Sequence, residues 1–225
     1  MKSFLFLTTF FFLSLSAARS TEFGNGGKGI VCPAAKTVQF YDTYESVQRY
    51  VLIPYLKDMN LSVCHIPEVE GWEILVPCLS KSIDLALESL QRVKPFDPVF
   101  VTELERLLHR FVTEAQFIDG ELFPTTDAGI GFIPQGCELK QLAVQHVSQF
   151  KNDSSYFISK PLWTQLSIAD RVALLIHEVV YKRALQITPN ISSSENVRYY
   201  SSYILSTSAL TRQKYAQIKK ILLEK

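Results

Sequence analysis

Apolar side chains recur at helical spacing over four stretches of the chain. In 38–52 they stand at positions 38, 41, 44, 47, 51 and 52, which predicts an amphipathic helix that Pro54 ends or kinks. Further helices are expected over 80–93 and, with Asp97 as the cap, from Pro98 to about Ala115. A segment over about 168–185, capped by Ser167, is apolar on nearly every side and predicts a central buried helix. One or two helices over about 194–223 follow.

The middle of the chain has a different pattern. Residues 139–146 alternate with a period of two, which predicts a strand, and residues 156–159 are its expected partner. Four glycines make 21–37 an irregular start, and prolines make 60–78 a loop. The expected fold class is therefore α+β: a mostly helical single domain over 21–225, with a small antiparallel sheet within 117–160.

The first twenty residues have the three parts of a secretory signal peptide. Lys2 is basic, the run 4–15 is nearly all apolar, and small residues follow. Cleavage after Ala18 and cleavage after Ser20 fit equally well. Because the apolar run is well short of the ~20 residues that a membrane-crossing helix needs, we expect a periplasmic or extracellular protein with no transmembrane segment in the mature chain.

Charge and cysteine content narrow the class of protein. The chain has 23 basic and 22 acidic residues, and the basic ones are scattered, so no nucleic-acid partner is expected. An even number of cysteines in an exported chain favours disulfides, and no CxxC pair is present. Three pairings are possible, of which we favour Cys32 with Cys137 and Cys64 with Cys78.

The most apolar predicted helix contains two ionisable residues, His177 and Glu178. A buried carboxylate needs a partner, and Arg183 and Arg198 are the candidates for Glu178. Tyr181 falls on the same helix face as His177, one turn later. One interpretation is a buried polar network of His177, Glu178, Tyr181 and Arg198 that joins the central helix to the carboxy-terminal part.

The alternative interpretation is an active site. His177 and Glu178 match the start of the zinc-binding pattern HExxH, but Tyr181 stands where the second histidine belongs. Glu195 could imitate a third ligand, although a glutamate at a helix start is also ordinary. No metal ion or other cofactor is expected. A metal-free acid–base site on His177 and Glu178 remains as the catalytic hypothesis.

Four segments of the sequence resemble a known group of proteins. They are GNGGKGIVC with FYDTYE, IPQGCELKQLAVQ, LWTQLSIADRVALLIHEVVYKRA and SSENVRYYSSYILS. The chain is similar to uncharacterised exported proteins of Gram-negative bacteria that have a GNGG start, a PxGCxxxQxAxQ segment, an LHExxYR helix and an SxxVR helix. His177, Glu178, Tyr181 and Arg198 match that pattern, whereas Arg183 is shifted by one position.

The resemblance implies a periplasmic or outer-envelope location, but it implies no activity. The leading functional hypothesis is an envelope protein that is not an enzyme and that binds a partner protein or a cell-wall component. The alternative is a hydrolase-like enzyme, possibly degenerate, centred on His177 and Glu178. A deep pocket that reaches these two side chains favours the enzyme, and a sealed network favours the binding protein.

Overall fold

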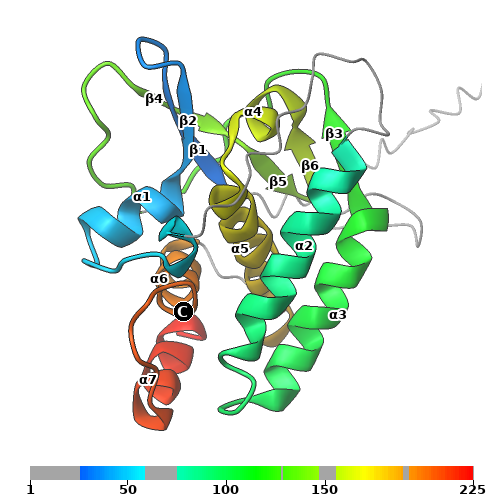
Figure 1. Cartoon of the computed structure of the whole chain (residues 1–225), viewed down its shortest axis with the longest axis vertical. Coiled ribbons are helices and arrows are strands. Elements are labelled where there is room, and N and C mark those ends of the chain that lie inside the picture. The colour runs from blue at the N-terminus through cyan, green and yellow to red at the C-terminus, as the bar shows by residue number, and fades with distance from the viewer. Residues whose placement is uncertain (1–25, 59–74, 128, 147–155, 190–192, 225) are drawn as a thin grey trace, which may run out of the picture.

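The computed structural model describes residues 26–58, 75–127, 129–146, 156–189 and 193–224. In this part of the chain, seven α-helices accompany two three-stranded sheets, which confirms the α+β fold class (Figure 1). The predicted signal peptide lies outside the described residues. No helix among the described residues has the length and apolar character needed to span a bilayer.

The first sheet lies near the amino terminus, where none was predicted. Strand β1 (Lys28–Cys32) pairs antiparallel with β2 (Thr37–Phe40) on one side and with β4 (Glu138–Gln141) on the other. The helix predicted over 38–52 is wrong at both ends, since α1 spans only Tyr41–Gln48. Val38 and Phe40 are buried and alternate with more exposed neighbours, so these apolar positions fit a strand as well as a helix.

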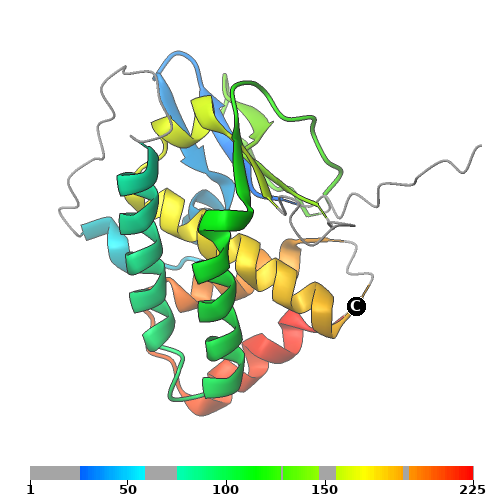
Figure 2. The ribbon, with the colours of Figure 1, turned by 90° about the vertical axis from the view of Figure 1, so that its right-hand side faces the viewer.

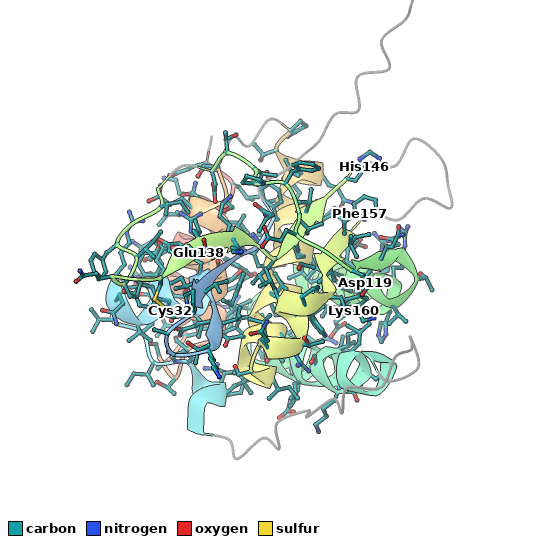
Figure 3. All side chains as sticks on the ribbon, turned by 90° about the horizontal axis from the view of Figure 1, so that it is seen from above. Cys32, Asp119, Glu138, His146, Phe157 and Lys160 are labelled. Carbon is teal, nitrogen blue, oxygen red and sulfur yellow. A yellow bond between two sulfur atoms is a disulfide. The ribbon has the colours of Figure 1, made fainter. Side chains whose placement is uncertain are left out.

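The strand predicted over 139–146 is in fact two strands, β4 in the first sheet and a second one in the other sheet. After β4, Leu142 donates its N–H to the Gly27 carbonyl, and β5 (Ala143–Gln145) joins the second sheet. Strand β5 pairs antiparallel with β6 (Tyr156–Ser159), as predicted, but β6 also pairs parallel with β3 (Ala115–Ile118). The sheet is therefore mixed. Figure 3 shows the two sheets side by side, with Glu138 on the first and Phe157 on the second.

The long helices begin where their capping residues predict. Helix α3 (Pro98–Glu114) starts at Asp97, whose side chain accepts a hydrogen bond from the Phe100 N–H. Helix α5 (Ile168–Ile187) starts at Ser167, which accepts one from the Asp170 N–H. Helix α2 (Leu75–Gln91) begins inside the predicted loop 60–78. Figure 2 shows α2 and α3 side by side against α5.

Helix α5 is the centre of the fold, as its apolar sequence predicts. It packs against α1, α2, α3 and β2, and on another side against α6 (Glu195–Ile204). Nearly every side chain in its first four turns is buried. The remaining helical elements are short or peripheral: the 3-10 turn η1 (Tyr55–Asp58), α4 (Lys160–Gln165) and α7 (Arg212–Leu222).

One predicted disulfide is present. Cys32, at the end of β1, is bonded to Cys137, immediately before β4, with their Cα atoms 4.2 Å apart. This bond joins the two strands at the end of the first sheet where Cys32 is labelled in Figure 3. Cys64 lies outside the described residues, so the pair of Cys64 with Cys78 stays a prediction.

Candidate functional site

The two ionisable residues of α5 lie at the middle of the protein. The exposed fraction is 1% for His177 and 0% for Glu178. Because they are adjacent on the helix, their side chains leave it about 100° apart and meet different elements. His177 meets α1, whereas Glu178 meets the chain before β1 and strand β5.

The His177 imidazole is paired with Asp42, in the first turn of α1. Its Nδ1 lies 2.7 Å from Asp42 Oδ2. Burial lowers the pKa of His177, but the charge and hydrogen bond of Asp42 outweigh this effect and raise the pKa to about 9. The ring is therefore protonated at neutral pH, and Nδ1 donates. Nε2 has no hydrogen-bond partner among the described residues.

The Glu178 carboxylate accepts two short hydrogen bonds. The Gly27 N–H donates to Oε1 at 2.7 Å, and the Gln145 amide donates to Oε2 at 2.7 Å. Burial raises the pKa of Glu178, while the His177 charge and these two donors oppose the rise. Both oxygens face N–H donors, which favours the ionised form. Gly27 permits this close approach, since a Cβ there would lie 2.2 Å from the Leu174 side chain.

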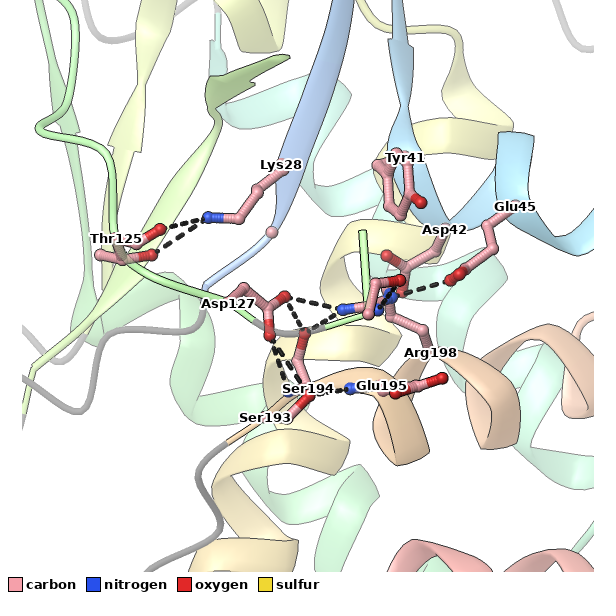
Figure 4. Close-up of polar contacts among 12 residues, drawn as sticks. Lys28, Tyr41, Asp42, Glu45, Thr125, Asp127, Ser193, Ser194, Glu195 and Arg198 are labelled. Carbon is pink, nitrogen blue, oxygen red and sulfur yellow. Dashed lines mark hydrogen bonds and ion pairs between the residues drawn. The ribbon is translucent and has the colours of Figure 1, made fainter. Parts of the chain in front are cut away.

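Arg198, on α6, is the buried cation of the site (Figure 4). Its Nε donates to Glu45 Oε2 at 2.7 Å, and its Nη1 donates to Asp127 Oδ2 at 2.7 Å. Nη1 also donates to the Ser194 hydroxyl at 2.8 Å, and Nη2 donates to the Gly129 carbonyl at 3.1 Å. A planar guanidinium suits such a set of acceptors better than a lysine amine would.

These contacts fix the segment that connects β3 to β4. We call this segment the 120–137 loop. Asp127 and Gly129 bind Arg198, and the Gly131 N–H donates to the Tyr41 hydroxyl at 2.7 Å. Nearer β3, the Lys28 amine donates to the Thr125 carbonyl at 2.6 Å. Gly129 has φ +72°, and a Cβ there would lie 2.5 Å from the Glu195 carboxylate. The loop is therefore held at several points although its described residues, 120–127 and 129–137, form no helix or strand.

The predicted network residues are all buried, but one predicted contact is wrong. Arg198 was one of two candidate partners for Glu178, whereas Glu178 is bound by Gly27 and Gln145, and Arg198 by Glu45 and Asp127. The Tyr181 ring lies 6.2 Å from that of His177, as expected for one turn. The other candidate partner, Arg183, donates to Gln186 on its own helix.

Several residues of the site were not predicted, namely the partners that come from other elements. An acidic pair three positions apart, Asp42 and Glu45, was present within the aromatic stretch 40–50 and could have indicated one charged inner helix face. Nothing in the local pattern marks Asp127, which lies in an irregular segment. The unpredicted members are Gly27, Asp42, Glu45, Asp127, Gly129 and Ser194.

The chemistry of an acid–base site is only partly present. Asp42 orients His177 as a carboxylate orients a general base, yet the ring is buried and no nucleophile lies within hydrogen-bond distance of Nε2 among the described residues. Glu195 pairs with Arg49 at 2.5 Å at the edge of the site. Within the described ranges, no three His, Cys, Asp or Glu side chains gather in a way that could hold a metal ion.

A small pocket between α1, α5 and α6 reaches one member of the network. Asp42, Ser201 and Ser202 line it, together with apolar side chains, and its about 20 Å³ of space suits a water molecule. The two serine hydroxyls have no hydrogen-bond partner among the described residues. Neither His177 nor Glu178 lines this pocket. Both side chains are almost fully buried.

The four sequence segments that carry the resemblance meet in this network. The first supplies Gly27, Asp42 and Glu45, and the second supplies Gln145. The third supplies the residues of α5, and the fourth supplies Arg198. No protein-family model, curated protein or solved structure matches this chain. Its function is therefore argued from its own chemistry.

Proposed function

We propose that this chain is an exported envelope protein that is not an enzyme, and that it binds a partner protein or a cell-wall component. Its buried polar network has a structural role: it holds the 120–137 loop in one conformation for binding. Export is supported by the signal pattern and by the Cys32–Cys137 disulfide, since disulfides persist in oxidising compartments.

One observation carries the proposal. The loop that the network fixes exposes two large apolar side chains, Phe123 at 91% and Phe132 at 74%. The polar groups around them are occupied: Asp127 and Gly129 bind Arg198, and Thr125 binds Lys28. A loop held in this way loses little conformational entropy on binding, and aromatic side chains are typical anchors of protein interfaces.

The experiment places a photoreactive amino acid at position 123 or 132 of the protein in a Gram-negative host. The same substitution at Val112, an exposed residue of α3, is the control. We expect a discrete cross-linked product, to a protein or to peptidoglycan fragments, from positions 123 and 132 but not from 112. The product should disappear when the other phenylalanine is changed to serine. Equal cross-linking from all three positions contradicts a specific surface.

The hydrolase alternative is tested on the same purified protein. Peptide, ester and glycoside substrates are offered to wild type and to Glu178→Gln. Turnover that the substitution abolishes, in a variant whose circular dichroism spectrum is unchanged, overturns the proposal.

A further inference from the structure

The Cys32–Cys137 disulfide closes the first sheet at the end where the 120–137 loop enters it. Strands β1 and β4 pair Val31 with Glu138, so Cys32 and Cys137 are the next two residues to face each other. Both cysteines are only half-buried, and the residues that follow Cys32 and precede Cys137 are exposed. The bond therefore lies near the surface, within reach of a thiol reductant.

The half of the loop before residue 128 is held by noncovalent contacts. The Thr125 N–H donates to Gln141 Oε1 at 3.1 Å, and the Thr125 carbonyl accepts from the Lys28 amine at 2.6 Å. Asp127 is bound in the buried ion pair described above. Lys28 stands at the opposite end of β1 from the disulfide. Phe123, which precedes these contacts in the chain, is therefore supported independently of the cysteines.

The half of the loop after residue 128 depends on the disulfide. The Gly131 N–H donates to the Tyr41 hydroxyl at 2.7 Å. Among the described residues, 132–136 take part in one hydrogen bond only, in which the Pro134 carbonyl closes the turn that ends at the disulfide. Phe132 therefore lies between a single hydrogen bond to the rest of the protein and the covalent S–S bond.

Reduction of the bond should loosen this half of the loop without unfolding the protein. Strand β1 keeps its pairing with β2 and β4, and the Gly27 N–H stays bound to the buried Glu178. Without the S–S bond, the pair of Val31 with Glu138 becomes the end of the sheet, where strands fray. Phe132 then stands on a freer segment, which a partner must order on binding, and this ordering weakens the affinity.

We propose that the Cys32–Cys137 disulfide is a redox-sensitive clamp on the part of the loop that carries Phe132. The oxidised protein binds its partner through Phe123 and Phe132, and the reduced protein loses the contribution of Phe132. This inference rests on the function proposed above and adds a means of regulation to it.

The reductant is a dithiol. One of its thiolates attacks the Sγ of one cysteine, and the S–S bond breaks as the other cysteine leaves as a thiolate and takes up a proton. The second thiol of the reductant loses its proton and attacks the mixed disulfide, which releases the first cysteine. Two electrons and two protons thus pass to the protein, and the reductant becomes a disulfide.

The first test needs no partner. The purified protein is treated with dithiothreitol, and a thiol reagent should then label Cys32 and Cys137 without denaturant. Hydrogen exchange should become about tenfold faster at the Gly131 and Glu138 amides, whereas the Thr125 amide, in the other half of the loop, should be unchanged. The double variant Cys32→Ser with Cys137→Ser should show the faster exchange with and without dithiothreitol, which excludes an effect of the other two cysteines.

The second test repeats the cross-linking described above in the double serine variant. Cross-linking from position 132 should fall severalfold, and cross-linking from position 123 should remain. The proposal is overturned if dithiothreitol leaves the native bond intact, if Gly131 and Glu138 exchange equally in both states, or if position 132 cross-links equally in both proteins. Loss of protection at every amide together also overturns it, because the bond then supports the whole fold. Absence of cross-linking from both positions in the wild type contradicts the proposed function, whereas the exchange difference would still support the clamp.

Discussion

The middle of α5 and the segment 49–53 reverse the usual distribution of polar and apolar residues. In α5, the charged Glu178 is buried, and both Glu178 and Arg198 of the neighbouring α6 have two or more hydrogen-bond partners. In the segment 49–53, Val51 and Ile53 are exposed, and the backbone at Val51 is strained. Buried polar groups that are satisfied make one conformation specific. Exposed apolar side chains bury little surface in the monomer, so the first region stabilises the fold and the second contributes little to it.

The largest expected effect comes from removing the buried cation. Arg198→Met leaves the Glu45 and Asp127 carboxylates in a buried site without their common partner. Breaking such a pair costs about 3–5 kcal/mol, a large part of the ~5–15 kcal/mol that stabilises a domain. Urea unfolding of the variant measures the loss. Arg106→Met, at an exposed pair with Glu103, serves as the control, and a loss as small as that of the control contradicts the structural role of Arg198.

The next effect is a loss of stability at alkaline pH. The pKa of His177 is raised from 6.5 to about 9 in the folded protein, so its contribution is complete below pH 6.5. That contribution, on the order of 3 kcal/mol, is lost as the pH rises from about 6.5 to 9. Urea unfolding across this range should show the decline in wild type and in His109→Gln, whose site is exposed. In His177→Gln the decline over these pH values should be absent.

Replacing Glu178 should have a smaller effect, because no opposite charge is left alone. In Glu178→Gln, an amide NH2 must face either the Gly27 N–H or the Gln145 amide. A buried donor without an acceptor costs about 1–3 kcal/mol. Since Glu178 and Arg198 have different partners, the losses of the two single variants should add in the double variant. Recovery of stability in the double variant would indicate a direct pair.

The smallest expected effect comes from removing an exposed cation, Arg49. Arg49 binds the same Glu45 as Arg198 does, at 3.0 Å, but its side chain is 46% exposed. Exposed ion pairs contribute about 0.2–1 kcal/mol and weaken with salt. Thermal melts of Arg49→Met should therefore lie close to wild type, and the difference should shrink further in 1 M salt. A loss equal to that of Arg198→Met contradicts the distinction between the two regions.

Local chemistry was enough to predict where α3 and α5 begin. Asp97 and Ser167 act as predicted, because a side-chain oxygen satisfies free N–H groups at the start of any helix, whatever its surroundings. The central burial of α5 followed from its apolar sequence, and so did the need of Glu178 for partners. The Cys32–Cys137 pair was favoured among three possibilities and is confirmed.

Most of the other long-range pairing could not be read from the sequence. The hairpin β1–β2 was missed because Val38 and Phe40 fit two periodicities. Residues 139–146 were predicted as one strand, since nothing in their pattern shows that the Leu142 N–H donates to the carbonyl of the distant Gly27. The partners of Arg198 come from α1 and from an irregular loop, and only the folded chain brings them together.

The order of the cysteines along the chain constrains how the protein reaches its native state. Cys32 and Cys137 are 105 positions apart, and Cys64 and Cys78 lie between them. In a chain that enters an oxidising compartment from its amino terminus, both intervening thiols arrive before Cys137. An oxidant that joins cysteines in order of arrival makes a non-native bond first, and thiol–disulfide exchange must then correct it. For a chain exported as proposed, correct maturation would therefore require disulfide isomerisation as well as oxidation.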